Sequence, residues 1–153
     1  MQKKCDLYLC GPVDASRLKM LRLFDNDFAC EDGKVFSGYL FVSVNRVKLV
    51  AVVSALRQKQ ILCFSVPVEY REGEISFEIA FEIAKKYSAE QGVVVVGVRD
   101  QSQCPPLFWS FSLSSVGHGE KKAGGMLMVD RLDGHIWGLD EYEEYMYDYN
   151  NIF

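Results

Sequence analysis

Histidine is scarce in this sequence of 153 residues, which contains only His118 and His135. Because histidine is the side chain most often used as a general base, this scarcity leaves few ways to build a nucleophilic active site. Pairing either histidine with Cys104 gives a Cys/His hydrolase as one alternative, yet no G-x-S-x-G or Q-A-C sequence surrounds a nucleophile. We therefore predict that the protein is not an enzyme and has no catalytic residues.

No two cysteines form a C-x-x-C pair, and their number is odd. Zinc usually takes four nitrogen or sulfur ligands with two of them close in sequence, a spacing that these cysteines do not offer. The carboxylates at residues 140–148 lack the EF-hand pattern that binds calcium. The glycine-rich segment 117–125 lacks the phosphate-binding motif G-x-x-x-x-G-K-[ST], and we interpret it as a hairpin loop, with an anion or partner contact as the alternative. We predict no metal, no cofactor and reduced thiols, several of them buried. The cysteines are Cys5, Cys10, Cys30, Cys63 and Cys104.

Long apolar runs are absent too. Apolar runs such as residues 93–96 are far shorter than the roughly 20 residues that span a bilayer. Near the start of the chain, Asp6 interrupts the apolar stretch that a secretory signal requires. We therefore expect a cytoplasmic protein that does not bind membranes.

What the sequence does contain is ample apolar material and an uneven distribution of charge. Hydrophobic residues make up 49% and charged residues 25%, which suffices for a packed core. Residues 1–72 carry a balance of +3 and residues 73–153 a balance of −7, within a net charge of −4. Nucleic-acid binding needs a concentrated basic surface, so this class of partner is not expected. The acidic second half instead fits a protein partner with a basic surface.

Residues 1–72 are predicted to form an α/β half of unknown type. A strand at residues 5–10 precedes a short helix capped by Asp14 or Ser16. The turn Glu31-Asp32-Gly33, with Gly33 free to take a positive φ, precedes a strand at residues 34–44. Residues 45–60 mix helical spacing with β-branched side chains; we favour a helix there, followed by a strand at 61–66.

Residues 73–153 are predicted to form a helix, a four-stranded antiparallel sheet and a last short helix. Ser76 caps the first helix, whose apolar stripe runs through Ile79 and Ile83 until Gln91-Gly92 ends it. Strands follow at 93–98, 107–113, 126–129 and 135–137, with a tight turn at Asp133-Gly134. The predicted class is α+β, with an antiparallel sheet and helices packed on one face, as a single compact domain or two small α+β halves.

The second half resembles the YrhB-like family, which is grouped with the immunity proteins of bacterial polymorphic toxin systems. The resemblance covers residues 74–150 and rests on the order of several segments. These are "ISFEIAFEIAKKY", an apolar strand, "LFWSFSL" around Trp109, "AGGMLMVDRLDGHIW" with its V-D-x-x-x-G-x-I hairpin, and "DEYEEYMYDY". The resemblance implies a non-enzymatic cytoplasmic protein that binds and neutralises a cognate toxin. It carries over no contact residues, because the shared elements look like scaffold.

The most distinctive segment is the acidic, tyrosine-rich end of the chain, where Asp140 is expected to cap a helix. Tyrosine is enriched at interface cores, and carboxylates attract a basic partner. At helical spacing Tyr142, Tyr145 and Tyr149 share a face, so some tyrosines are expected to pack inward while the acids face outward. The predicted partner-binding residues are Asp140, Glu141, Tyr142, Glu143, Glu144, Tyr147 and Asp148.

Together these observations predict an immunity protein whose partner is a cognate protein toxin with a basic surface. The alternative is a chaperone-like or adaptor protein without a dedicated toxin partner, which would bind many unfolded chains through an exposed apolar patch. The thiol hydrolase at Cys104 is the third class.

Overall fold

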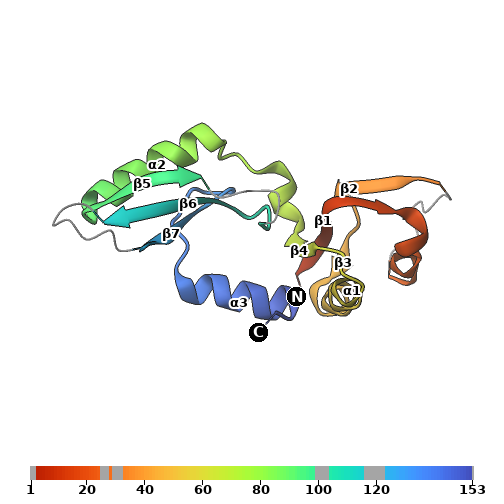
Figure 1. The fold of residues 1–153 in the computed structure, drawn as a ribbon. Coiled ribbons are helices and arrows are strands. Elements are labelled where there is room, and N and C mark those ends of the chain that lie inside the picture. The colour runs from red at the N-terminus through yellow and green to blue at the C-terminus, as the bar shows by residue number, and fades with distance from the viewer. Residues whose placement is uncertain (1–2, 25–27, 29–32, 99–103, 116–122, 153) are drawn as a thin grey trace. The chain divides into compact units, whose positions relative to one another are not determined.

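The computed structural model describes residues 3–24, 28, 33–98, 104–115 and 123–152 (Figure 1). The chain divides into two compact units. Unit 1 consists of residues 1–71 and 140–153, and unit 2 of residues 72–139. Each unit contains an antiparallel sheet and at least one helix, so the predicted α+β class is confirmed. Among the described residues, no helix combines the length and the apolar character needed to cross a membrane.

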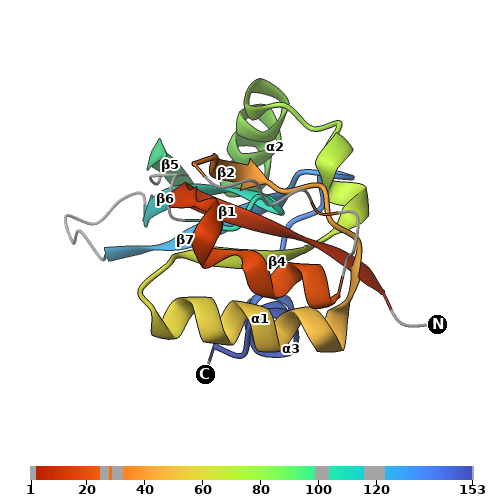
Figure 2. The same cartoon turned by 90° about the vertical axis from the view of Figure 1, so that its right-hand side faces the viewer.

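The sheet of unit 1 is built around the long strand β1 (Lys4–Asp14). It pairs antiparallel with β2 (Val35–Tyr39), β3 (Val44–Asn45) and β4 (Cys63–Pro67). Helix α1 (Arg46–Gln58) lies beside this sheet (Figure 2) and buries Leu49, Val53 and Leu56 in the same core as β1. Asn45 starts α1 by accepting a hydrogen bond from the Val47 backbone N–H at 2.9 Å. The predicted helix in this segment is therefore confirmed.

Two local predictions in unit 1 need adjustment. The helix after Asp14 is not an α-helix but two short 3-10 helices, Ala15–Arg17 and Lys19–Leu23, with Asp14 as the N-cap of the first. The predicted strand at residues 34–44 is interrupted between β2 and β3, because Phe41 has a φ of +60° that removes it from the ladder. Gly33 has the expected positive φ, +87°, whereas Glu31 and Asp32 lie outside the described residues.

Unit 2 packs helix α2 (Phe77–Glu90) on one face of the sheet β5-β6-β7. The strands are β5 (Val93–Val98), β6 (Phe108–Ser115) and β7 (Ala123–Asp130). Ser76 caps α2 as predicted, accepting a hydrogen bond from the Ile79 N–H at 3.3 Å. The small side chains of Ala80 and Ala84 are fully buried and let the helix approach Phe111 of the sheet.

The structure divides the chain differently from the predicted halves. In the described part of unit 2, the predicted fourth strand at residues 135–137 is reduced to a single bridge between Val129 and Ile136. Gly134 makes this tight return possible with a φ of +79°. The last helix, α3 (Leu139–Asn150), belongs with the N-terminal residues in unit 1. Because α3 begins at Leu139, Asp140 lies in its first turn and is not its cap.

Placing α3 in unit 1 also changes the distribution of charge. Unit 1 has eleven Lys and Arg against twelve Asp and Glu, a balance of −1. Unit 2 has six against nine, a balance of −3. The contrast between the two sequence halves is therefore not a contrast between the folded units. The acidic end of the chain folds onto the basic first half, so any acidic surface must be sought on α3 itself.

Candidate functional site

The inner face of α3 closes the free edge of strand β4. Tyr145 is 4% exposed, and its hydroxyl donates a hydrogen bond to the Ser65 carbonyl at 2.8 Å. The Asn150 side-chain oxygen accepts one from the Ser65 N–H, also at 2.8 Å. Ser65 lies opposite Leu7 of β1, and both of its backbone polar groups point away from that strand toward α3. The helix thus supplies the partners that a further strand would otherwise provide.

The backbone polar groups of neighbouring residues on the same edge of β4 are also accounted for. Arg57 of α1 donates from Nε and Nη2 to the Cys63 carbonyl at 3.2 and 2.9 Å. Pro67, two residues beyond Ser65, has no N–H to satisfy. In the last turn of α3, the Arg46 guanidinium donates to the Asp148 carbonyl at 2.6 Å and lies 5.4 Å from the centre of the Tyr149 ring. These contacts fix both the position and the rotation of α3 on unit 1.

Burial also affects the chemistry of the inner tyrosines. The pKa of the Tyr145 hydroxyl is raised well above its ordinary value, because burial disfavours the charged phenolate. Burial raises the pKa of Tyr149 in the same way. Both side chains therefore act as neutral packing groups. The expectation that some C-terminal tyrosines are core residues is confirmed for Tyr145.

We expect Tyr145→Phe to lower the free energy of unfolding by about 1–3 kcal/mol, because it leaves the buried Ser65 carbonyl without its partner. Tyr147→Phe is the matched control, since Tyr147 is exposed and its change is expected to stay within about 0.5 kcal/mol. Urea unfolding followed by circular dichroism measures both. Equal stability of the two variants would show that α3 does not depend on this bond.

The outer face of α3 carries a carboxylate stripe, defined here as Asp140, Glu143, Glu144 and Tyr147. Their spacing of i, i+3, i+4 and i+7 places them on one side of the helix, and all four are exposed. Tyr147 is 58% exposed. Among the residues that the structure describes, none forms an ion pair with the three carboxylates. The stripe is therefore a fixed, negatively charged surface with an aromatic ring at its end.

The predicted partner-binding residues thus fall into two groups. Asp140, Glu143, Glu144 and Tyr147 come together in the carboxylate stripe. Glu141, Tyr142 and Asp148 lie at its borders and are half-buried. A partner that contacts the stripe head-on would therefore meet four of the seven residues first.

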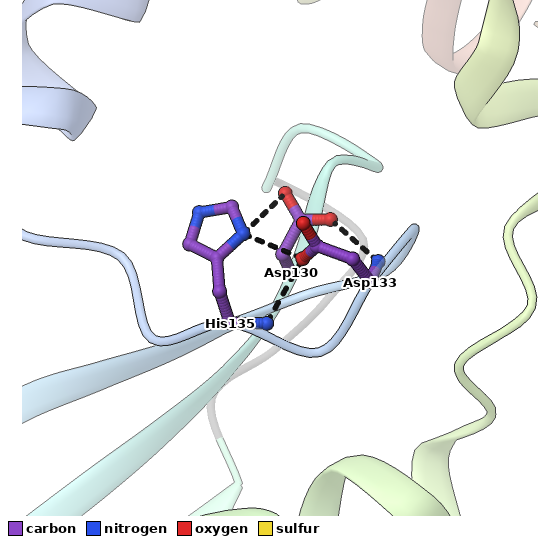
Figure 3. Close-up of side chains that lie close together, drawn as sticks. All are labelled: Asp130, Asp133 and His135. Carbon is purple, nitrogen blue, oxygen red and sulfur yellow. Dashed lines mark hydrogen bonds and ion pairs between the residues drawn. The ribbon is translucent and has the colours of Figure 1, made fainter.

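A second cluster of titratable groups lies in the hairpin after β7 (Figure 3). Asp130 is fully buried; its Oδ1 accepts hydrogen bonds from the Leu132 and Asp133 N–H groups at 2.7 and 3.2 Å. Its Oδ2 accepts one from the Trp137 indole at 2.8 Å. The His135 Nδ1 lies 2.5 Å from Asp133 Oδ1 and 3.9 Å from Asp130 Oδ2. Asp130, Asp133 and His135 could offer three ligand atoms to a metal ion.

The arrangement is explained more simply as a brace for the hairpin turn. The Asp130 carboxylate already accepts three hydrogen bonds, and the backbone N–H and the ring Nδ1 of His135 both contact Asp133 Oδ1. The pKa of Asp133 is lowered, mainly by the hydrogen bond that its carboxylate accepts from the backbone N–H of His135. Sequence reasoning overlooked this group because it considered cysteine spacing and residues 140–148. The D-x-x-D-x-H spacing within the predicted hairpin was the available signal.

Trp109, the centre of the aromatic strand in the family resemblance, has a structural role in unit 2. Its indole N–H donates to the Ile75 carbonyl at 2.9 Å. The Arg131 guanidinium lies 3.8 Å from its ring centre, and Arg131 Nε also donates to the Phe108 carbonyl at 3.1 Å. These contacts connect the start of α2, the strand β6 and the hairpin. Trp109 therefore stabilises the scaffold of unit 2.

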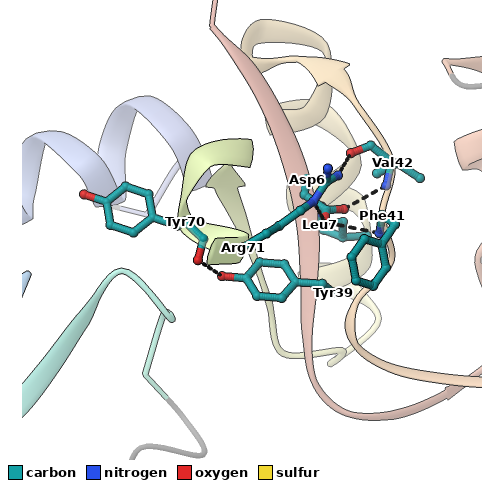
Figure 4. Close-up of polar contacts among 7 residues, drawn as sticks. All are labelled: Asp6, Leu7, Tyr39, Phe41, Val42, Tyr70 and Arg71. Carbon is teal, nitrogen blue, oxygen red and sulfur yellow. Dashed lines mark hydrogen bonds and ion pairs between the residues drawn. The ribbon is translucent and has the colours of Figure 1, made fainter. Parts of the chain in front are cut away.

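A buried ion pair in unit 1 was also not predicted from the sequence (Figure 4). Asp6 is fully buried and pairs with Arg71, whose Nε lies 2.7 Å from Asp6 Oδ2. The carboxylate also accepts three backbone hydrogen bonds, from Leu7, Phe41 and Val42. A lone aspartate in an apolar strand was the signal for this network, but its partners are distant in sequence.

The residues of the alternative thiol hydrolase are only partly described. His118 and most of segment 117–125 lie outside the described residues, and Cys104 is half-buried in the turn before β6. The His135 ring contacts Asp133 and Asp130. Cys5 and Cys63 are buried, and burial raises the pKa of their thiols to about 11 and about 12. Such thiols are inert at neutral pH.

Comparison of the chain with protein families, curated proteins and solved structures finds no match.

Proposed function

We propose that this chain is a non-enzymatic immunity protein that binds and neutralises a cognate bacterial toxin in the cytoplasm. The observation that carries the proposal is the carboxylate stripe on α3. Its three acidic side chains have no ion-pair partner among the described residues, although unit 1 contains eleven Lys and Arg. Surface carboxylates held on a fixed helix are suited to attract a basic protein surface.

The rigidity of α3 adds to this argument. Binding costs less when the contact residues are already ordered, and three hydrogen bonds that involve Tyr145, Asn150 and Arg46 hold the helix in place. Tyr147 supplies exposed aromatic area beside the acids, at a low cost in side-chain entropy. The stripe thus combines long-range attraction with a short-range contact.

The resemblance to the YrhB-like family supports the choice of a toxin as the partner. Most of its motifs correspond to elements of unit 2, whereas the segment "DEYEEYMYDY" forms α3 of unit 1 and carries the stripe. In this proposal unit 2 is a scaffold, and the contacts with the toxin lie on the outer face of α3. Toxins that act on nucleic acids or other anions commonly need basic surfaces, which is the charge that the stripe would meet.

The stripe predicts a specific effect of charge on association. We expect Asp140→Asn/Glu143→Gln/Glu144→Gln to slow association with the toxin at least tenfold at low salt, with the difference shrinking as salt rises. Glu74→Gln/Glu78→Gln/Glu90→Gln is the matched control, because it removes three exposed carboxylates from unit 2. Surface plasmon resonance at several salt concentrations measures both. Equal association rates for the two variants would exclude the stripe as the interface.

The function itself is tested by co-expression with the product of the neighbouring gene as the candidate toxin. We expect a stable complex on co-purification and survival of cells that would otherwise be killed. The absence of both the complex and the protection would overturn the proposal. Binding to unrelated unfolded chains with similar affinity would instead favour the chaperone-like alternative.

A further inference from the structure

Phe41 stands out in unit 1 because it combines an unfavourable backbone conformation with exposure to solvent. Its φ is +60°, in the left-handed region that bulky residues rarely adopt, and its side chain is 73% exposed. Two other non-glycine residues among those described, Gln60 and Asn151, also have a positive φ. Asn151 directly follows α3, and Gln60 lies two residues after the end of α1; this conformation is common just beyond helix ends. Phe41 lies between two strands and has no such explanation.

The backbone around Phe41 is held in place by the buried carboxylate of Asp6 (Figure 4). Asp6 Oδ2 accepts a hydrogen bond from the Phe41 N–H at 3.1 Å, and Oδ1 accepts one from the Val42 N–H at 3.0 Å. A fully buried carboxylate is costly unless its oxygens are satisfied. The Asp6 carboxylate accepts hydrogen bonds from Phe41 and Val42, and these bonds fix the direction in which the Phe41 ring projects.

Arg71 completes the arrangement from the other side. Its Nε donates to Asp6 Oδ2, its Nη2 donates to the Val42 carbonyl, and its guanidinium lies 5.3 Å from the centre of the Phe41 ring. Its remaining nitrogen, Nη1, has no hydrogen-bond partner among the described residues. The side chain of Arg71 is 23% exposed. An exposed aromatic ring therefore lies beside a guanidinium group that retains donors.

Beyond the contacts of its ring with the Arg71 guanidinium and the Tyr39 ring, Phe41 contributes little to folding. Glycine or asparagine would adopt the same backbone conformation with less steric cost, and an exposed phenyl ring gains little from burial. Strained residues that are held by an over-determined surrounding network are characteristic of binding and catalytic sites. Aromatic and arginine side chains are also the residue types that dominate binding energy at protein interfaces.

We infer that Phe41 is an aromatic anchor that inserts into an apolar pocket of a protein partner, with an oxygen acceptor at the rim of that pocket meeting Arg71 Nη1. Asp6 and Arg71 position the ring before binding occurs. For the identity of the partner the inference rests on the proposed function, and the partner is the cognate toxin. The anchor is a contact separate from the carboxylate stripe, so the two can be tested independently.

The first arm of the test needs no partner. Phe41→Gly and Phe41→Asn are expected to have a urea midpoint equal to or higher than that of the unmodified protein, because both residues tolerate a positive φ. A clearly lower midpoint for both variants would show that Phe41 is retained for folding, and the inference would be overturned.

The second arm measures binding to the product of the neighbouring gene by titration calorimetry. Both Phe41 variants are expected to lose at least tenfold in affinity, whereas Leu23→Ala, which removes another exposed apolar side chain of unit 1, is expected to bind normally. Unchanged affinity in the Phe41 variants, with weaker binding by the stripe variant, would reject the anchor and leave the proposed function standing. If the unmodified protein forms no complex, the proposed function fails and the anchor fails with it.

Discussion

Asp6→Ala is expected to lower the free energy of unfolding by about 3–5 kcal/mol, the cost of breaking a buried ion pair by removing one partner. The substitution leaves the Arg71 guanidinium without its carboxylate in a site where only 23% of that side chain is exposed. It also removes the acceptor of the Leu7, Phe41 and Val42 N–H groups. Each of these losses is costly because the groups are shielded from water.

The Lys3–Glu69 pair provides the matched control for Asp6. It is also a close ion pair, with Lys3 Nζ 2.6 Å from Glu69 Oε1, but its side chains are 45% and 40% exposed. Glu69→Ala is therefore expected to cost less than about 1 kcal/mol. Urea unfolding of both variants measures the difference. A cost for Asp6→Ala as small as that for Glu69→Ala would show that the carboxylate does not hold the segment around Phe41.

A marked loss of stability in alkaline solution is the second large effect. Burial raises the pKa of the Cys5 and Cys63 thiols from 9.0 to about 11 and about 12. Above pH 9.0 the thiols of the unfolded chain ionise, whereas the buried thiols of the folded protein stay neutral up to their raised pKa. The stability that these thiols contribute is therefore fully present below pH 9.0 and is lost as the pH rises. At about pH 10.5 each thiol is expected to cost about 2 kcal/mol. Tyr145, whose pKa is also raised by burial, adds to the loss in the same direction.

Cys63→Ala isolates the contribution of one thiol. Removing the buried sulfur lowers stability at neutral pH, but the further loss between pH 8 and about 10.5 is expected to shrink by about 2 kcal/mol. Cys104→Ala is the control, because Cys104 is half-buried. Urea unfolding at several pH values measures the slopes. The same slope in the unmodified protein and in Cys63→Ala would contradict the burial of that thiol.

The parts of the fold that were predicted correctly depend on local patterns. Helix α2 follows from its apolar stripe and from Ser76, whose capping bond spans three residues. The hairpin at Gly134 follows from the preference of glycine for a positive φ. Neither prediction required knowledge of which distant segments meet.

The features that could not be predicted depend on contacts between distant residues. The bond from Tyr145 to Ser65 joins residues 80 positions apart, and it places α3 with the first half of the chain. The break between β2 and β3 depends on Asp6, which is 35 residues from Phe41. The periodicity of the last helix did indicate an inner and an outer face. Only the structure shows that side chains on the inner face bond the backbone of β4, as a neighbouring strand would.

The central claim is that α3 has a structural face and a binding face, and one paired measurement tests it directly. The free energy of unfolding and the dissociation constant for the candidate toxin are determined for two variants. Tyr145→Phe is expected to lose about 1–3 kcal/mol of stability with its affinity for the toxin unchanged. Asp140→Asn/Glu143→Gln/Glu144→Gln is expected to keep its stability within about 0.5 kcal/mol and to lose at least tenfold in affinity. Full affinity in the triple variant would contradict the account.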